Sequence, residues 1–199
     1  MNRKWLSVLF ISAIIIAGYI ILFPDNSLDQ TIMTLKLEKD IILYQFFYYL
    51  SFMGSRNVLV PFVIIGSAYL YLKFKKLQPS LIFLSGTLLS SLLNTLIKHL
   101  IKRERPSIIE AVHGTGFSFP SGHAMISTVC YGLFLFYLTK LIKRRYKRNL
   151  LIIFSAMLLL LIGYSRIALN VHYFTDILGG YIIGLLFISF YLKINKQTF

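Results

Sequence analysis

Cysteine and acidic residues are scarce in this sequence of 199 residues. A single cysteine, Cys130, excludes a disulfide scaffold and a cysteine-based zinc site. Charged residues make up 14% of the chain, whereas typical soluble domains have about 25%. Hydrophobic residues make up 57% and the mean hydropathy is +0.72, which excludes a disordered chain and an ordinary soluble domain. The remaining class is an integral membrane protein.

Long hydrophobic runs dominate what is present. A helix needs about 20 mostly apolar residues to cross the hydrocarbon core of a membrane. Stretches that reach or approach this length occupy residues 5–23, 57–72, 81–97, 122–142, 150–165 and 177–192. Flanking lysine, arginine and tyrosine side chains can extend the shorter ones. No small-residue cleavage site follows the first stretch, so we interpret it as an uncleaved helix and not as a signal peptide.

These stretches predict an all-α fold, a bundle of six transmembrane helices. We find no internal repeat, low-complexity segment or linker, so we expect one domain over residues 1–199. A further uncharged stretch, residues 41–55, is too short for a span and is rich in phenylalanine and tyrosine. It suits the outer membrane interface or a re-entrant segment, and its aromatic residues suit either an interfacial anchor or a lipid entrance.

The distribution of charge predicts the orientation. With both termini in the cytoplasm, the inner segments hold 13 basic residues and no acidic one, and all seven acidic residues lie outside. A seventh span would place the basic run 143–148 outside, against the same rule. Topology therefore explains most of the net charge of +14. We expect no nucleic-acid partner, and contact with anionic lipid would be incidental.

Eight basic residues fall outside in this topology. Three of them, Lys36, Lys39 and Arg56, lie in the acidic first loop and are explained by solvation. The other five cluster at the outer ends of two predicted spans: Lys98, Lys102, Arg103, Arg105 and Arg166. Positive charge beside hydrocarbon is costly unless negative charge matches it, and the few nearby acids do not. A bound anion is the economical explanation.

Three polar stretches share this outer depth, at residues 98–106, 119–123 and 165–176. Lys98 and Arg105 are two helical turns apart, so a continuing helix would place them on one face. Arginine suits bidentate contact with phosphate, and lysine adds a compact point charge. The first stretch thus suits an anion.

The other two stretches add a helix start and an acid–base pair. Ser121 and Gly122 open a helix, where free N–H groups and the positive end of the dipole favour an anion. If the turn from His172 to Asp176 is helical, the carboxylate can hold one imidazole nitrogen and leave the other free to attack.

Simpler explanations exist for single residues. Interfacial histidines are more often structural than catalytic, and we expect this of His99 and His113. A Ser-Gly pair before a helix is commonly only a cap, and Cys130 in mid-span suits packing. The polar residues become informative because they converge on one side.

The three stretches resemble the three-part signature of the type-2 phosphatidic acid phosphatase superfamily, which also contains vanadium haloperoxidases. Lys-x6-Arg-Pro is matched at residues 98–106, Pro-Ser-Gly-His at 120–123 and Ser-Arg-x5-His-x3-Asp at 165–176, without departure. Three ordered motifs at the correct spacing form a specific signal. In size and layout the chain is similar to small bacterial lipid phosphatases of the phosphatidylglycerophosphatase B and undecaprenyl-diphosphate phosphatase types.

The resemblance implies a role for each matched residue. His172 would be the nucleophile that forms a phosphohistidine, Asp176 would orient it, and His123 would protonate the leaving alkoxide and then activate water. The phosphoryl oxygens would be held by Lys98, Arg105, Ser121, Gly122 and Arg166. Three cations would supply the neutralisation that Mg²⁺ supplies elsewhere. No carboxylates occur nearby at metal-ligand spacing, so we expect no metal and no other cofactor.

The expected function is a membrane lipid phosphatase whose site lies at the outer face of the membrane. Phosphatidylglycerophosphate, phosphatidate and undecaprenyl diphosphate all remain candidate substrates, and the oligomeric state is open. One alternative is a vanadate-dependent haloperoxidase, although those enzymes are soluble and longer. Another is a non-enzymatic lipid or anion transporter, which would need more polar residues inside the spans than Asn94 and a few serines and threonines.

The orientation can be tested by cysteine labelling after the native Cys130 is replaced. A cysteine near Arg145 should react with an impermeant maleimide only from the cytoplasmic side, and one near His113 only from outside, because basic loops stay inside. The measurement compares intact cells with inverted vesicles. The opposite pattern would overturn both the orientation and the side of the site.

Overall fold

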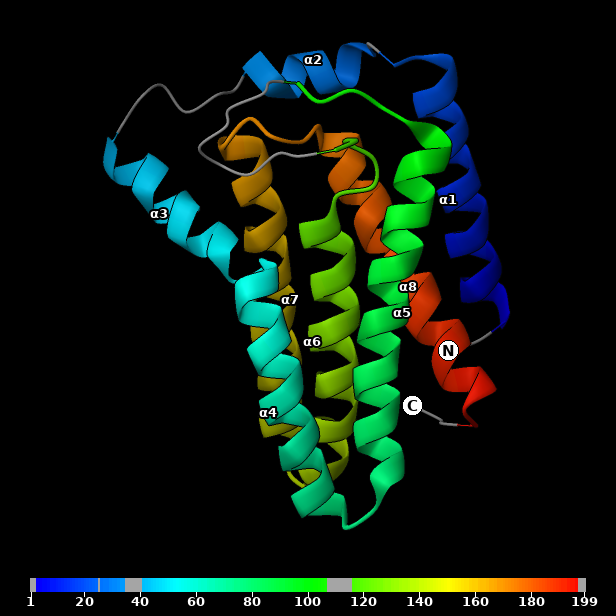
Figure 1. The fold of residues 1–199 in the computed structure, drawn as a ribbon, viewed down its shortest axis with the longest axis vertical. Coiled ribbons are helices and arrows are strands. Elements are labelled where there is room, and N and C mark those ends of the chain that lie inside the picture. Colours follow the sequence, from blue (N-terminus) through cyan, green and yellow to red (C-terminus); the bar gives the residue numbers. More distant parts are fainter. Residues whose placement is uncertain (1–2, 25, 35–40, 107–115, 197–199) are drawn as a thin grey trace.

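The computed structural model describes residues 3–24, 26–34, 41–106 and 116–196, and within these ranges it contains helices and no strand. The helices are α1 (Arg3–Leu22), α2 (Ser27–Thr34), α3 (Ile41–Phe52), α4 (Arg56–Phe74), α5 (Leu77–Ile101), α6 (Gly122–Leu141), α7 (Arg145–Ala168) and α8 (Phe174–Ile194). Figure 1 shows a bundle of roughly parallel long helices, which confirms the predicted fold class. The prediction for His113 lies outside the described residues.

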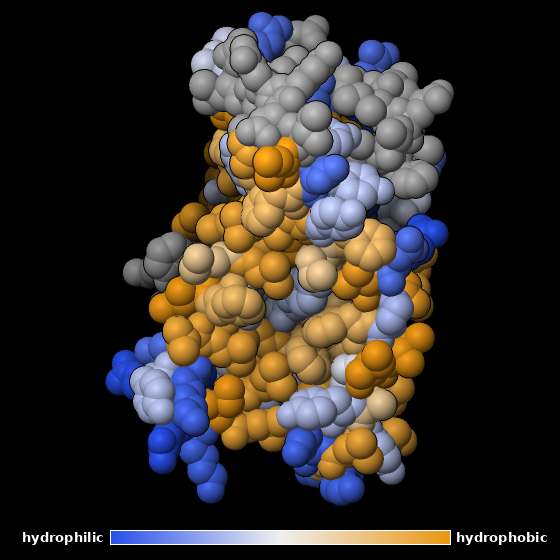
Figure 2. Space-filling view, turned by 90° about the vertical axis from the view of Figure 1, so that its left-hand side faces the viewer, coloured by the Kyte–Doolittle hydropathy of each residue, from blue (hydrophilic) through white to orange (hydrophobic). Residues whose placement is uncertain are grey.

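Five helical stretches of the described chain are long and apolar enough to cross a membrane: Ile42–Phe74, Leu77–Ile101, Gly122–Leu141, Arg145–Ala168 and Phe174–Ile194. A sixth is obtained if Ser7–Leu22 and Ser27–Met33, bent by 86°, count as one span. Hydrophobic side chains cover the middle of the face in Figure 2, and hydrophilic ones gather at its lower end. The molecule is therefore a multi-pass membrane protein.

The aromatic stretch at 41–55 forms α3 and the turn that follows it. Figure 1 shows α3 inclined to α4, so the apolar stretch Ile42–Phe74 contains two helices in different directions. α3 packs against the end of α7, where Phe47 contacts Leu169 and the rings of Phe47 and Tyr164 lie 5.3 Å apart. The corner between α3 and α4 is thereby held against the bundle.

α6 lies inside the bundle and contacts α4, α5, α7 and α8. Glycine lets α8 come very close to it: a Cβ at Gly180 would lie 2.9 Å from the Cβ of Ala124 and 3.0 Å from the carbonyl oxygen of Ser121. Farther along, Val129 and Leu133 of α6 belong to the buried core. This packing fixes the first turn of α6 relative to α8.

The same end of the bundle carries all three polar stretches. α5 and α7 end there and α6 and α8 begin there, at the top of Figure 1. α4 ends and α5 begins at the opposite end. Side chains far apart in the sequence thus meet at one depth.

Candidate active site

His172 and Asp176 meet where α7 gives way to α8. Residues 169–173 lie between the two helices and α8 begins only at Phe174, so the helical turn that was one condition for this contact does not form. The pair forms through the start of α8 instead. The backbone N–H of Tyr173 donates to Oδ2 of Asp176 at 2.9 Å, and this oxygen lies 3.4 Å from Nδ1 of His172. Capping of the helix therefore orients the carboxylate toward the imidazole.

A serine that the sequence did not single out completes this contact. The hydroxyl of Ser118 donates to Oδ2 of Asp176 at 2.5 Å and lies 3.3 Å from Nδ1 of His172. Its N–H donates to the carbonyl oxygen of Arg103 at 2.8 Å, so its position depends on the segment after α5. Ser118 stands just before the Pro-Ser-Gly-His motif, and nothing in its own surroundings in the sequence marks it.

Arg103 joins Asp176 to a second buried carboxylate. Its Nη1 donates to Oδ1 of Asp176 at 2.8 Å, and its Nη2 donates to Oδ2 of Asp29 at 2.7 Å. Thr175 also donates to Asp29, through its N–H at 3.0 Å and its hydroxyl at 2.6 Å. Burial lowers the pKa of Arg103, but the charge of Asp176 and hydrogen bonds to both carboxylates raise it above its usual value. Arg103 therefore stays charged and holds Asp176 in place.

The sequence had placed Arg103 in the outer basic cluster and Asp29 in the outer loop, without pairing them. They are 74 positions apart, and neither sits in a motif that relates them. The pairing exists because α2 lies across the end of α8. Only the tertiary arrangement could have identified it.

Lys98 lies in the last turn of α5 and reaches the segment that leads to α6. Its Nζ donates to the carbonyl oxygens of Phe117 and Ser118, the second at 3.2 Å. It forms no ion pair within the part of the chain that the structure describes. The hydrogen bonds of Lys98 therefore go to neutral carbonyl groups, and no carboxylate of the described chain neutralises its positive charge.

Arg105 enters the site from beyond α5. The helix ends at Ile101 and Lys102 takes a left-handed conformation (φ 53°), so the continuing helix that would place Arg105 on the face of Lys98 does not form. Nη1 of Arg105 donates to the carbonyl oxygen of Val171 at 2.8 Å and lies 3.3 Å from Nε2 of His172. Burial lowers the pKa of Arg105, and the charge of Asp176 partly offsets this.

His172 is almost fully buried, with 2% of its surface exposed. Burial lowers its pKa to about 3, and the hydrogen bond and charge of Asp176 offset only part of that effect. The ring is neutral at neutral pH. Asp176 beside Nδ1 favours the tautomer that carries its proton there, which leaves the lone pair of Nε2 on the side of Arg105.

Ser121 and Gly122 open α6, as predicted. The N–H of Ser121 donates to the carbonyl oxygen of Asp176 at 3.0 Å, which ties the start of α6 to α8. Asn94 of α5 donates to the carbonyl oxygen of Pro120 at 3.2 Å. A Cβ at Gly122 would lie 3.3 Å from Oδ1 of Asn94, so a larger residue there would crowd this support.

His123 and Arg166 face the corner between α3 and α4. Nη1 of Arg166 donates to the hydroxyl of Ser51 in α3. A Cβ at Gly54 would lie only 2.9 Å from Cδ2 of His123, so the chain at this corner touches the imidazole. His123 also interacts electrostatically with Arg166 and His172. The structure therefore brings together the residues that match the three motifs. Lys102, which the sequence grouped with the outer cations, is exposed and lies outside these contacts.

Three buried donors of this site have no partner in the described part of the chain. They are Nε of Arg103, Nε of Arg166 and the hydroxyl of Ser121. Leaving such a group unsatisfied costs about 1–3 kcal/mol, and more when it is charged. The other nitrogens of Arg103 are paired with Asp29 and Asp176, whereas Arg166 and Ser121 contact no carboxylate in these ranges and suit a bound oxyanion.

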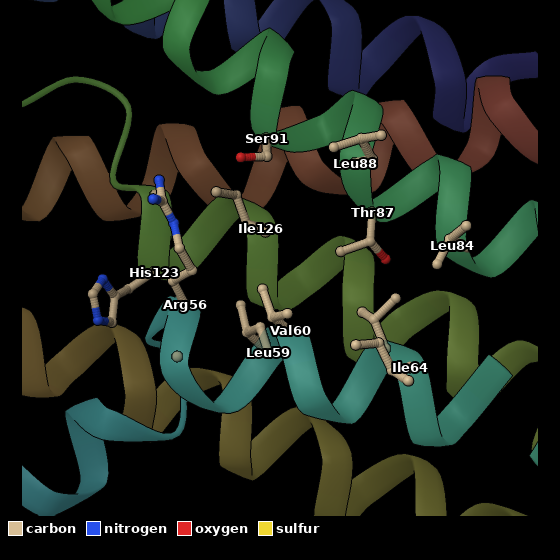
Figure 3. A pocket seen from close by; sticks show the side chains of 13 residues that line it. Arg56, Leu59, Val60, Ile64, Leu84, Thr87, Leu88, Ser91, His123 and Ile126 are labelled. Carbon is tan, nitrogen blue, oxygen red and sulfur yellow. The ribbon is translucent and has the colours of Figure 1, made fainter. Parts of the chain in front are cut away.

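An apolar pocket of about 580 Å³ adjoins this polar site. Gly122, His123 and Arg56 line one end, and mostly aliphatic side chains of α4, α5 and α6, with Thr87 and Ser91, line the rest (Figure 3). A pocket that is polar at one end and apolar along its length suits an amphiphile.

No group of three or more histidine, cysteine, aspartate or glutamate side chains within residues 3–24, 26–34, 41–106 and 116–196 could hold a metal ion. The described site instead offers a buried His–Asp pair among cationic side chains. Together with the fold, this defines a membrane-embedded enzyme for an anionic group.

Comparison with known proteins identifies the family. A model of the PAP2 superfamily matches residues 79–199, and the chain belongs to this superfamily. It is 33% identical to phosphatidylglycerophosphatase B of Bacillus subtilis (strain 168) over 138 residues, which cover 69% of this chain and 68% of that protein. The predicted family is thereby confirmed, and the protein is a membrane phosphatase.

Two crystal structures share the fold. The transmembrane PAP2 type phosphatidylglycerolphosphate phosphatase from Bacillus subtilis superposes with a TM-score of 0.82 at 27% identity, over 96% of each chain. LpxE from Aquifex aeolicus superposes with a TM-score of 0.64 at 24% identity, over 85% of this chain and 97% of that one, and indicates the fold alone.

Gly54→Ala tests the contact between the α3–α4 corner and His123. The new methyl group would lie 2.7 Å from Cγ2 of Ile162 and 2.9 Å from the His123 ring, so the ring must shift. We expect turnover of a lipid phosphate to fall about tenfold or more, because displacements near 1 Å are costly in catalysis. Gly18→Ala is the matched control, since no atom lies within 4 Å of its added Cβ. Equal turnover in both variants would refute the role of this contact.

Proposed function

We propose that this protein hydrolyses the phosphate group of a membrane lipid in two steps, through a phosphohistidine. The observation that carries this proposal is the buried His172 held between Asp176 and Arg105. Burial lowers the pKa of this imidazole to about 3, so it keeps its lone pair at neutral pH, which a nucleophile requires.

In the first step, Nε2 of His172 attacks phosphorus and the bond to the lipid oxygen breaks. His123 donates a proton to that oxygen, so the lipid leaves as an alcohol. Asp176 stabilises the positive charge that develops on His172, through the Nδ1 contact.

In the second step, water attacks the phosphohistidine. His123, now unprotonated, accepts the proton of that water, and the nitrogen–phosphorus bond breaks to release phosphate. The electron pair of the broken bond returns to Nε2. Both residues are then ready for another substrate molecule.

The phosphoryl oxygens are held by Lys98, Arg105 and Arg166 together with the Ser121 hydroxyl and the Gly122 N–H. The unsatisfied donors of Ser121 and Arg166 support this arrangement. Three cations favour the five-coordinate transition state, in which negative charge is concentrated on the equatorial oxygens. We therefore propose a reaction that requires no metal.

The substrate class follows from the pocket beside His123. An apolar groove suits an acyl or prenyl tail and leaves the phosphate at the polar end. Phosphatidylglycerophosphate, phosphatidate and undecaprenyl diphosphate meet this requirement, and the name of the Bacillus relative supports the first. We propose one domain over residues 1–199, with both termini in the cytoplasm and the site facing outside, from the charge distribution.

Substitution of the two histidines separates their roles. His172→Ala should abolish the phosphoenzyme, measured by rapid quench with ³²P-labelled lipid phosphate, because no nucleophile remains. His123→Ala should slow alkyl phosphates more than p-nitrophenyl phosphate, because only the poor leaving group needs its proton. His99→Ala is the control, since His99 is exposed and packs edge-on against Phe117. A phosphoenzyme in His172→Ala would reject the covalent mechanism.

Vanadate and chelators test the cationic cradle. Vanadate adopts the five-coordinate geometry, so it should inhibit strongly, while EDTA should leave the rate unchanged. Arg166→Lys should lower kcat/KM by about 10²–10³, because lysine keeps the charge but loses the planar fork. Loss of activity in EDTA with recovery in Mg²⁺ would contradict the cradle and require a metal site.

A further inference from the structure

Arg56 lines the apolar pocket, a position that the sequence did not predict. The sequence placed it in the acidic first loop, but the structure makes it the first residue of α4 and a lining residue of the apolar pocket. Its side chain is exposed and has no hydrogen bond or ion pair with any residue in the described ranges. Figure 3 shows it at the same end of the pocket as His123, rising toward the start of α6.

The corner that carries Arg56 is fixed by three contacts, two with active-site residues and one with Tyr131 of α6. Ser51 accepts a hydrogen bond from Arg166, and the carbonyl oxygen of Met53 accepts one from the Tyr131 hydroxyl at 2.7 Å. The third contact is the approach of Gly54 to His123. Arg56 follows Gly54 by two residues, so its backbone has a defined place beside the imidazole.

The α3–α4 corner, which carries Arg56, lies beside the residue that is proposed to protonate the leaving group. His123 is the proposed proton donor to the lipid oxygen, so the part of the substrate next to that oxygen lies near His123. Beyond Arg56 the pocket continues past Leu59 and Val60 to Ile64, all apolar (Figure 3). A substrate bound along this path presents its phosphate, then the linking group, then its tail.

Arg56 is an unpaired cation of the described chain at the polar end of this pocket. Arginine binds phosphate through two parallel hydrogen bonds, so its chemistry suits a second anionic group of the substrate. The cations Lys98, Arg105 and Arg166 are assigned to the phosphate that is cleaved. Arg56 is then the cation placed for an anion in the linking group of the substrate.

We propose that Arg56 is a specificity-determining residue that binds a second phosphate of the substrate, located between the cleaved phosphate and the lipid tail. The proposal rests on the proposed function and narrows its substrate class. A phosphodiester in the head group and the inner phosphate of a prenyl diphosphate both supply this anion. A lipid with a single phosphate monoester does not.

The test compares lipids that share a tail and differ in the second phosphate, with purified protein in detergent. One pair is farnesyl diphosphate and farnesyl phosphate, and the other is phosphatidylglycerophosphate and phosphatidate. For each pair, the ratio of kcat/KM with and without the second phosphate is measured. Arg56→Gln should lower this ratio by about tenfold, the loss expected for one charge-assisted contact. Arg56→Lys should retain part of it, because the charge remains.

Lys102→Gln is the matched control. Lys102 is exposed at the same end of the bundle and does not line this pocket, so its removal changes net charge equally and should leave the ratio as in the wild type. A fall in the ratio for only one pair supports the proposal and identifies which kind of second phosphate is bound. An unchanged ratio in Arg56→Gln, or an equal fall in Lys102→Gln, overturns it.

Failure of this proposal is distinguishable from failure of the proposed function. Hydrolysis of both members of a pair with a ratio that is insensitive to Arg56 removes only the role of Arg56. Absence of hydrolysis by the wild-type protein in both pairs removes the lipid phosphatase function itself, and the second-phosphate site with it. Elution of Arg56→Gln as a single symmetrical peak, with measurable turnover, confirms that the variant is folded.

Discussion

The carboxylate of Asp176 is the interaction on which the rest of the site depends. Its Oδ2 accepts hydrogen bonds from Ser118 and from the Tyr173 N–H and faces His172, while its Oδ1 pairs with Arg103. These partners come from three separate parts of the chain. A fully buried carboxylate is stable only when its oxygens are satisfied in this way, so the network that stabilises the charge also sets the position of the imidazole.

The cations around His172 require negative charge, just as the buried Asp176 requires hydrogen-bond donors. Arg103 is neutralised by two carboxylates, but Lys98 and Arg166 form no ion pair within the described ranges. In the proposed function, the buried donors of Arg166 and Ser121 that have no partner in these ranges bind phosphoryl oxygens, and Lys98 adds positive charge. In the same proposal, the apolar pocket beside His123 accepts the tail of the lipid.

Several features could be predicted from the sequence because they depend on local pattern. Hydropathy located every long helix, since a membrane span must be apolar over its whole length. Spacing identified His172 and Asp176 as partners. Their contact does not need the helical turn that was considered for it, because it forms at the start of α8. Lys98 and Arg105 likewise converge although α5 stops at Ile101.

The sequence by itself determined the class of fold, the family and the residues of the three motifs. These depend on composition and on spacings within short segments. Tertiary structure alone decided that Asp29 supports Asp176 through Arg103, that Gly54 touches His123, and that Arg56 lines a pocket instead of a solvated loop. Such contacts join residues far apart in the chain, and they form only because packing of the whole bundle brings the helix ends together.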